Sequence, residues 1–462
     1  MDRLFDNQSD CWASTQTVDA QEASLLRLYS GKTLGELKSL AGDRLVVLGE
    51  GGGNANSLPL FWLENGPDPD IEGRVEIGTG NLMGVLNLVD RETGSKCRVE
   101  VGSRFDKGSV GQPFLSYLLS KVYDVSYLDL VNAGELPYLE ILLAIKFVSQ
   151  LSKARQVGLY RDYRNFKCND MKPRGRIDFA RHLRKNMPLG ASLAYEKREI
   201  SYDLPINHLL RMAAQRIEQK WPLLFVRNVG ARAMLTDLKV NTPSYLSSTP
   251  RMLLASRDCR ESMRHPYFSQ YYEELRVMAR LILAEEGADV FEDDDNEVSG
   301  VLFDGAWLWE AYLATILEPC GYLHAICETN IGRRPLFNRN PIDVEMCNVY
   351  PDFYREVDGG SVLDAKYKRG KATREDVLQM MAYVLNTGAS RIGLVYPPDG
   401  LVNVRAEHFE SQVNKAKCKD PTFWRSFQFE AIKESVKNDA DAVVRYMERQ
   451  ESMLAEFATC SS

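Results

Sequence analysis

The spacing of apolar residues divides the chain into three parts. Residues 1 to about 110 hold short runs of strand-forming residues separated by turn residues, at 43–49, 58–64, 73–79, 83–89 and 97–103, which predicts a small β domain. From about 112 to 288 apolar residues recur at intervals of three and four. This spacing predicts helices over 114–123, 138–154, 207–219 and 271–286.

The third part changes pattern again and predicts a mixed sheet. Its order is a helix over 305–319, a hairpin over 350–368, a helix over 374–388, a strand over 391–397 and a late helix over 429–457. An α-β-β-α-β order suits a mixed sheet flanked by helices, in a compact catalytic module. We therefore expect an α/β (α+β) protein with a β-rich domain at 1–110, a mostly helical region at 111–290 and a third domain at 291–462. The acidic run 292–295 is typical of an exposed linker.

Composition narrows the class of protein. Hydrophobic residues make up 44% of the chain, no apolar run reaches the length of a membrane span, and the first residues lack the layout of a signal peptide, so we expect a soluble protein without membrane contact. The nine cysteines are scattered and form no CxxC pair, which favours reduced thiols in the cytoplasm over a zinc site. We predict no nucleotide site, because Leu26 stands where a phosphate-binding loop ending in Gly31-Lys32-Thr33 requires glycine.

Positive charge is concentrated in one segment of an otherwise acidic chain. The formal net charge is -7, yet residues 153–185 carry eleven Lys and Arg against three Asp, with aromatic residues between them. Such a patch can neutralise phosphates or bind an acidic partner. The alternative is a solvated face whose balancing acids come from other parts of the fold.

Acidic residues and a lysine stand on the predicted hairpin at 350–368. If residues 358–360 form a three-residue loop, Tyr354 faces Asp364 and Asp352 faces Lys366. The two carboxylates then share a face with the lysine, at a diagonal of roughly 7 Å between β-carbons. Carboxylates at this separation can hold Mg²⁺, while the lysine can orient an attacking water and help to deprotonate it. A two-residue turn would instead place Asp352 on the opposite face.

Nearby polar residues extend the candidate site. Glu310 lies beside the apolar stripe of the helix at 305–319, where its carboxylate can reach a metal, or it is a surface residue with its head in solvent. Gln379 and Tyr383 are four apart on one face of the next helix and either support the site or form an amphipathic edge. The alternative for the hairpin is a surface salt bridge between Asp352 and Lys366.

Four motifs in this order resemble a known family. Residues 351–368 (PDFYREVDGGSVLDAKYK), with WEAYL before and QMMAY after, are similar to the PD-(D/E)xK nuclease core of the kind that carries a downstream QxxxY motif. Together with RGRIDFARHL at 174–183 and SYDLPINHLLRMAAQRI at 201–217, they resemble McrC, the nuclease subunit of modification-dependent McrBC restriction systems. The resemblance runs from about residue 70 to 400, so residues 1–70 lie outside it.

The resemblance implies a role for each site residue. Asp352 and Asp364, with the carbonyl of Ala365, would bind Mg²⁺ or Mn²⁺, and Lys366 would serve the water nucleophile. Glu310 would be an accessory carboxylate, and Gln379 and Tyr383 would support the site. The third domain would then be a restriction-endonuclease-like core that hydrolyses phosphodiesters of double-stranded DNA.

The resemblance also implies a partner. McrC-like proteins work with McrB, an AAA+ GTPase that recognises modified cytosine and translocates DNA, and their non-nuclease part binds that ring and stimulates its GTPase. The basic segment 153–185 is the candidate for contact with the partner or with DNA. Two alternatives stay open: a non-catalytic activator of an AAA+ NTPase, and a stand-alone DNA repair nuclease.

Overall fold

The computed structural model forms two compact units. Residues 1–139 and 296–462 make one, called here the sheet unit, and residues 140–295 make the other, the helical unit. The domain limits expected from the sequence, at 110/111 and 290/291, stay predictions. The residues that the structure describes are 4–6, 14–41, 45–48, 59–63, 74–90, 94–107, 112–123, 127–132, 137–187, 190–263, 265–284, 298–325, 331–335, 348–357, 359–369, 372–398, 409–410, 423–437 and 439–459. The acidic run predicted as a linker at 292–295 lies outside them.

The N-terminal part of the sheet unit is built on a five-stranded sheet, in which one strand comes from residues 298–304, much later in the chain. The strand order is β1 (Leu4–Phe5), β7 (Lys96–Gly102), β6 (Leu82–Val89), β11 (Val298–Asp304) and β3 (Leu45–Leu48). Strand β11 runs antiparallel to β6 and parallel to β3. At Gly84 (φ +129°) a Cβ would lie 2.1 Å from the Val301 carbonyl oxygen, so this close crossing requires glycine.

Two helices complete this region, where the sequence predicted strands alone. Helix α1 (Ala20–Tyr29) begins at a capping box in which Asp19 and Glu22 bond each other's backbone N–H groups. Helix α2 (Leu34–Ala41) follows, and both bury apolar side chains in one core with β6, β7 and β11. A smaller sheet is formed by β2 (Ser14–Thr17), β5 (Arg74–Thr79) and β4 (Phe61–Leu63).

The C-terminal part of the sheet unit carries the mixed sheet that the sequence predicted. Its order is β12 (Leu323–His324), β15 (Phe353–Arg355), β16 (Ser361–Ala365), β17 (Arg391–Tyr396), β19 (Phe423–Trp424) and β18 (Phe409–Glu410), and β20 (Phe427–Gln428) also pairs with β17. Strand β16 is antiparallel to β15 and parallel to β17. The predicted α/β class with a mixed sheet is confirmed.

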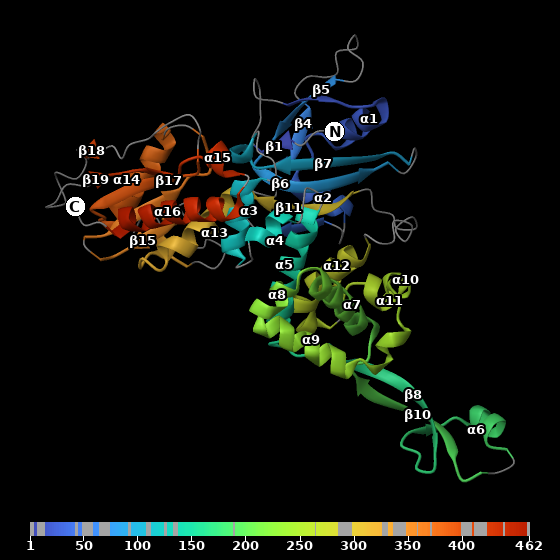
Figure 1. The fold of residues 1–462 in the computed structure, drawn as a ribbon. Coiled ribbons are helices and arrows are strands. Elements are labelled where there is room, and N and C mark those ends of the chain that lie inside the picture. Colours follow the sequence, from blue (N-terminus) through green and yellow to red (C-terminus); the bar gives the residue numbers. More distant parts are fainter. Residues whose placement is uncertain are drawn as a thin grey trace. The chain divides into compact units, whose positions relative to one another are not determined.

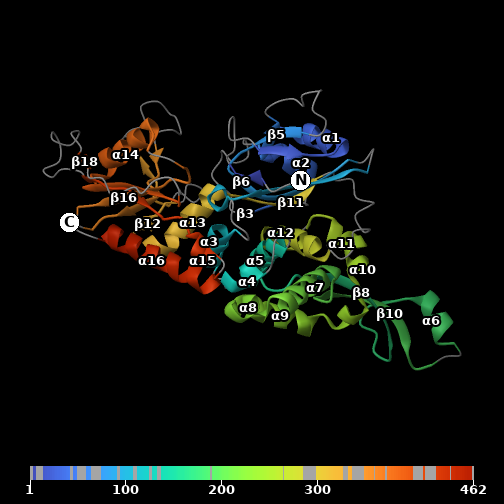
Figure 2. The same cartoon turned by 45° about the horizontal axis from the view of Figure 1, so that its top comes forward.

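Helices cover both faces of this sheet. In Figure 2, α14 (Arg374–Thr387) lies on one face, and α13 (Gly305–Leu317) and α16 (Ala440–Thr459) lie on the other. Tyr383 and Met380 of α14 pack on Val362 and Leu394 in one apolar cluster. The other elements of the unit are η4 (Arg104–Asp106), α3 (Pro113–Val122), α4 (Tyr127–Asn132), β13 (Arg334–Pro335), β14 (Asn348–Val349) and α15 (Glu434–Lys437).

The helical unit carries a long two-stranded arm, shown in Figure 1. Strands β8 (Asp162–Asp170) and β10 (Leu193–Ser201) pair along their whole length, with β9 (Arg176–Ile177) and α6 (Phe179–Lys185) at the far end. The sequence predicted a mostly helical region at 111–290 and missed the strands of the arm. The helices are α5 (Pro137–Ala154), α7 (Pro205–Lys220), α8 (Pro222–Arg227), α9 (Val229–Asn241), η5 (Pro243–Ser247), α10 (Pro250–Ala255), α11 (Arg257–Arg260) and α12 (Pro266–Ala284). In the described part of the chain, no helix combines the length and apolar character that crossing a membrane requires.

Candidate active site

The predicted hairpin is present, but its register was wrong by two residues. Arg355 pairs with Ser361, so the loop covers five residues, 356–360, instead of three. Gly359 and Gly360 both have φ near +82°, and the Ser390 N–H donates to the Gly359 carbonyl, at 2.9 Å. The loop is therefore shaped by the neighbouring strand as well as by its own glycines. Asp358 lies outside the described residues.

A shift of two residues keeps every side chain on the face that was predicted. In the observed register Asp352 falls opposite Asp364, where the prediction had placed Lys366. The Asp352 Oδ2 atom accepts a hydrogen bond from the Ala365 N–H, at 2.8 Å. Lys366 places its Nζ 2.6 Å from Asp364 Oδ2, so it pairs with its own strand and does not form the exposed ladder with Asp352 that was the alternative.

Asp352, Asp364 and Glu310 form a group of mutually repelling carboxyls, of which Asp364 is buried and the other two are half-buried. Burial raises the pKa of Asp352 well above its usual value, and the Asp364 and Glu310 charges add to the effect. Burial likewise raises the pKa of Glu310 to about 7, with Asp364 and then Asp304 as further causes and Lys366 opposing them. A bound cation would favour the ionised carboxylates and so relieve this repulsion.

The lysine keeps its positive charge in this setting. Burial works against the charged ammonium, but the carboxylates of Asp364, Asp352 and Asp376 together outweigh burial and raise the pKa of Lys366. Burial also raises the pKa of Asp364 itself, and Lys366 opposes that shift. At neutral pH the lysine is therefore a cation that can stabilise negative charge on a nearby oxygen.

The donor set fits a hard divalent cation. Asp364 is fully buried, and its Oδ1 accepts no hydrogen bond from any residue that the structure describes. A buried carboxylate oxygen without a donor is costly unless something else occupies that direction. Oxygen ligands from Asp352 and Asp364 are those that Mg²⁺ and Mn²⁺ prefer. Within the described ranges no three His, Cys, Asp or Glu side chains already converge as a metal cage, and the ligand role of the Ala365 carbonyl stays a prediction.

Gln379 and Tyr383 belong to the same hydrogen-bonded group. The Lys366 ammonium donates to Gln379 Oε1 at 2.8 Å, and Gln379 Nε2 donates to the Tyr383 hydroxyl at 2.7 Å. That hydroxyl donates in turn to the Tyr350 carbonyl oxygen, at 3.1 Å. Tyr383 therefore contacts Gln379, and Gln379 contacts the lysine, in a chain of hydrogen bonds that we call the relay. A simple amphipathic edge, which was the alternative, does not describe them.

Helix α13 brings Glu310 to the site. The helix begins at Asp304, whose side chain accepts from the Ala306 N–H at 2.8 Å. Trp309 is fully buried and its Nε1 donates to the Val395 carbonyl, which fixes the helix against β17. Glu310 follows directly and is half-buried, so it is not the exposed surface residue that was its alternative.

Sequence reasoning missed an acid that also faces the lysine. Asp376 Oδ1 lies 3.7 Å from Lys366 Nζ, while its Oδ2 accepts from Lys368 and caps α14 through Thr373. The Thr373-x-x-Asp376 spacing is that of a capping box, so the sequence alone predicts that a helix begins here. The sequence alone does not show that the same carboxylate also meets Lys366.

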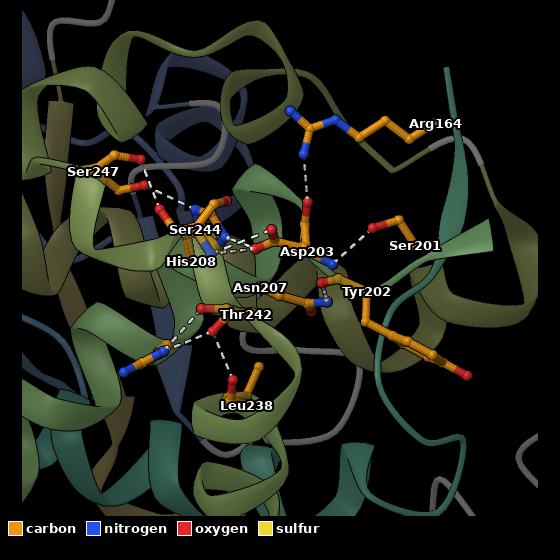
Figure 3. Close-up of polar contacts among 12 residues, drawn as sticks. Arg164, Ser201, Tyr202, Asp203, Asn207, His208, Leu238, Thr242, Ser244 and Ser247 are labelled. Atoms are coloured by element: carbon orange, nitrogen blue, oxygen red, sulfur yellow. Dashed lines mark hydrogen bonds and ion pairs between the residues drawn. The ribbon is translucent and has the colours of Figure 1, made fainter. Parts of the chain in front are cut away.

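The predicted basic segment forms most of the arm of the helical unit. Its Arg164, Lys167, Arg174 and Lys185 side chains are exposed. Figure 3 shows the root of the arm, where a cluster of polar contacts surrounds Asp203. The role of the basic segment 153–185 in binding a partner or DNA stays a prediction.

Two side chains of α7 hold the arm root. Asn207 Nδ2 donates to the Tyr160 and Tyr202 carbonyls, at 2.8 and 2.6 Å, and these carbonyls lie just before β8 and just after β10. His208 Nε2 lies 2.6 Å from Asp203 Oδ1. Both ends of the arm are therefore fixed to one buried helix turn.

Comparisons with known proteins give a matching family model and similar solved structures. The family model described as "McrBC 5-methylcytosine restriction system component" matches residues 77–397. The chain is similar to a chain of the refined half-complex from the tetradecameric assembly of Thermococcus gammatolerans McrB AAA+ hexamers with bound McrC, at 15% identity and a TM-score of 0.47, covering 97% of this chain and 99% of that chain. It is also similar to a chain of the cryo-EM structure of the Thermococcus gammatolerans McrBC complex, at 13% identity and a TM-score of 0.31, covering 69% of this chain and 87% of that one. The search of curated proteins gave no match.

Proposed function

The chain belongs to the McrBC 5-methylcytosine restriction system component family, and we propose that it is the DNA-cleaving subunit of such a system. The reaction would be Mg²⁺-dependent hydrolysis of DNA phosphodiesters, carried out together with a McrB-like AAA+ GTPase. The observation that carries the proposal is the meeting of Asp352, Asp364 and Lys366 on one hairpin face, with a buried Asp364 oxygen that lacks a hydrogen-bond donor.

Each side chain has a task that follows from its surroundings. Asp352 and Asp364 would hold the cation, with Ala365 contributing its carbonyl and Glu310 acting as an accessory carboxylate. The bound ion would polarise the phosphate and lower the pKa of a bound water. Lys366 stays protonated and would stabilise negative charge that develops on the phosphate oxygens. Gln379, fixed by Tyr383, would hold that ammonium in place.

The decisive experiment removes the Asp364 charge. We expect Asp364→Asn and Asp364→Ala to abolish Mg²⁺-dependent cleavage of cytosine-methylated DNA in the presence of the AAA+ partner and GTP. Folding and partner binding should remain, because the substitution is confined to the metal side of the hairpin. Asp439→Asn is the matched control, since Asp439 caps α16 in the same unit and lies outside the site. Cleavage at the wild-type rate by either Asp364 variant would rule out this active site.

The same assay separates the other two functions. An activator without nuclease activity would stimulate GTP hydrolysis by the partner and leave the DNA uncut. A stand-alone nuclease would cut DNA with Mg²⁺ and neither partner nor GTP. We expect cleavage that requires all three components, because the site carries the nuclease side chains and the sequence has no complete phosphate-binding loop.

The arm of the helical unit is our candidate for the contact with the partner or the DNA. Its exposed positive charges suit an acidic surface or a phosphate backbone. Charge reversal of Arg174 and Lys185 should weaken GTPase stimulation if the arm meets the partner, and DNA binding by the complex if it meets DNA. Wild-type values for both measurements would remove the arm from either role.

A further inference from the structure

The segment that follows strand β16 is held by residues that directly follow strand β7 of the N-terminal sheet. Arg104 Nη2 donates to the Tyr367 carbonyl oxygen at 2.6 Å, and its guanidinium lies 4.9 Å from the centre of the Tyr367 ring. The Tyr367 hydroxyl lies 3.1 Å from Ser103 Oγ. Phe105 packs edge-on against the same ring, at 5.0 Å between centroids, and Arg369 donates to the Arg104 carbonyl. We call Ser103, Arg104 and Phe105 the latch.

The latch arginine is itself held by a buried carboxylate. Asp6 is fully buried and Arg104 is 5% exposed. Asp6 Oδ1 accepts from the Arg104 backbone N–H at 2.6 Å, and its Oδ2 lies 3.5 Å from Arg104 Nε. A buried ion pair contributes little net stability, because desolvation offsets the attraction between the charges. Stability alone is therefore a weak explanation for this pair, and fixing the position of what Arg104 contacts is a stronger one.

Tyr367 is the residue after Lys366, so the latch acts one peptide bond from the proposed catalytic lysine. The Lys366 N–H donates to the Val395 carbonyl at 2.9 Å, which fixes the backbone on one side of the lysine. Arg104 binds the Tyr367 carbonyl, which fixes it on the other. The ammonium is then directed between Asp364 and Gln379. Displacement of a reacting group by about 1 Å can lower a rate about 100-fold.

We propose that Arg104 is a positioning residue for Lys366, so that the short helix η4, which directly follows β7, is part of the nuclease machinery. The inference rests on the proposed nuclease function. It differs from a purely structural role in one measurable way. Loss of the latch should lower the cleavage rate at saturating Mg²⁺ and leave the half-saturating Mg²⁺ concentration unchanged, because Asp352 and Asp364 are held by strand pairing and the Ala365 N–H.

The test uses the full chain with its AAA+ partner, GTP and cytosine-methylated DNA. The main variant is Asp6→Asn with Arg104→Gln, which removes the donor to Tyr367 without leaving a buried charge unpaired. Arg104→Lys is the second variant, because one ammonium cannot reproduce the fork that serves both Asp6 and the Tyr367 carbonyl. The matched control is Gln450→Leu, which breaks a buried side chain's hydrogen bonds to Glu430 in the same unit.

We expect both latch variants to cleave roughly tenfold to 100-fold more slowly at saturating Mg²⁺, with half-saturation and GTPase stimulation within twofold of wild type. The Gln450→Leu control, whose Tm should fall by a comparable amount, should cleave at nearly the wild-type rate. A second measurement needs no metal and no cleavage. Acylation of Lys366 in the chain alone, followed by mass spectrometry with Lys121 as internal reference, should be several times faster in the latch variants because the ammonium is held less tightly.

Each result decides the matter. Latch variants that match the Gln450→Leu control in rate, or that leave Lys366 acylation unchanged, overturn the positioning role while the nuclease assignment stands. A rate loss accompanied by an equal loss of Mg²⁺ affinity or GTPase stimulation assigns Arg104 to general stability and also overturns it. Wild-type chain without Mg²⁺-dependent cleavage, or an Asp364→Asn variant with full cleavage, refutes the nuclease function and the role of Arg104 with it.

Discussion

Replacing Tyr383 by Phe tests whether the α14 residues act on the lysine as a relay. The tyrosine ring is 3% exposed and packs in the apolar cluster of the sheet, which phenylalanine can keep. The substitution removes only the hydroxyl, which accepts from Gln379 at 2.7 Å and donates to the Tyr350 carbonyl at 3.1 Å. Net values of about 0.5–1.5 kcal/mol for each of the two hydrogen bonds predict a loss of about 1–3 kcal/mol in the free energy of unfolding.

The effect on cleavage follows from what the hydroxyl does for Gln379. Without it the amide loses its orientation and holds the Lys366 ammonium less well. A loss of about 1 kcal/mol in the transition state corresponds to a rate about fivefold lower. Gln379→Ala removes the contact with the ammonium itself. A hydrogen bond to a charged group contributes about 2 kcal/mol, which corresponds to a rate about 30-fold lower.

The double variant gives the sharpest test. If Tyr383 acts through Gln379, then adding Tyr383→Phe to Gln379→Ala changes nothing further, and the double variant stays about 30-fold below wild type. If the two residues act independently, their losses multiply to about 150-fold. Single-turnover cleavage of methylated DNA by the complex, at saturating Mg²⁺ and GTP, measures all four rates. A multiplied loss would refute the relay.

Three further outcomes follow from the same structure. Asp352→Asn should abolish cleavage without lowering the Tm. The raised pKa of Asp352 makes the neutral amide a fair substitute in the fold, and the amide oxygen can still accept a hydrogen bond from the Ala365 N–H. A large drop in Tm would contradict this. Mg²⁺ should raise the Tm of the wild-type chain more at pH 8 than at pH 6, because the proton on Glu310, with its pKa of about 7, competes with the ion at the lower pH. An equal Tm shift at both pH values would contradict the proposed metal site. Burial raises the pKa of Asp6 from 3.8 to about 6, so wild type should lose about 2 kcal/mol of unfolding free energy relative to Asp6→Asn as the pH rises from about 4 to about 6. A difference between the two proteins that does not change with pH, in urea titrations, would exclude this ionisation.

The face on which the acidic residues lie was predictable, and their pairing was not. Alternation along a strand has a period of two, so any even error in register leaves Asp352, Asp364 and Lys366 on one side. The register itself depends on Gly359 and Gly360 at positive φ and on a hydrogen bond from Ser390 of the following strand. The hydrogen bond from Ser390 is a tertiary contact, so the local sequence of the hairpin does not predict it.

The arm was missed for a physical reason of another kind. Strand β8 is largely exposed and β10 is only partly buried, and most of their residues are charged or polar. The alternation of apolar and polar residues that marks a half-buried strand is therefore absent. Strand β11 shows the opposite case. Its apolar run is visible in the sequence, but nothing in the local sequence indicates that it pairs with β6 and β3, which lie more than 200 residues earlier in the chain.

The surroundings of Lys366 decide between two mechanisms for it. A lysine that removes a proton from water needs a pKa lowered towards neutrality, which burial alone would provide. Here Asp364 at 2.6 Å, with Asp352 and Asp376 behind it, more than offsets burial and raises the pKa. A permanent cation stabilises charge in proportion to how well it is placed, so its value depends on the groups that aim it. The α14 residues and the latch at η4 orient the same ammonium independently of each other. Losses in cleavage rate from one α14 substitution and one latch substitution should therefore multiply, whereas losses from two substitutions within the same group should not.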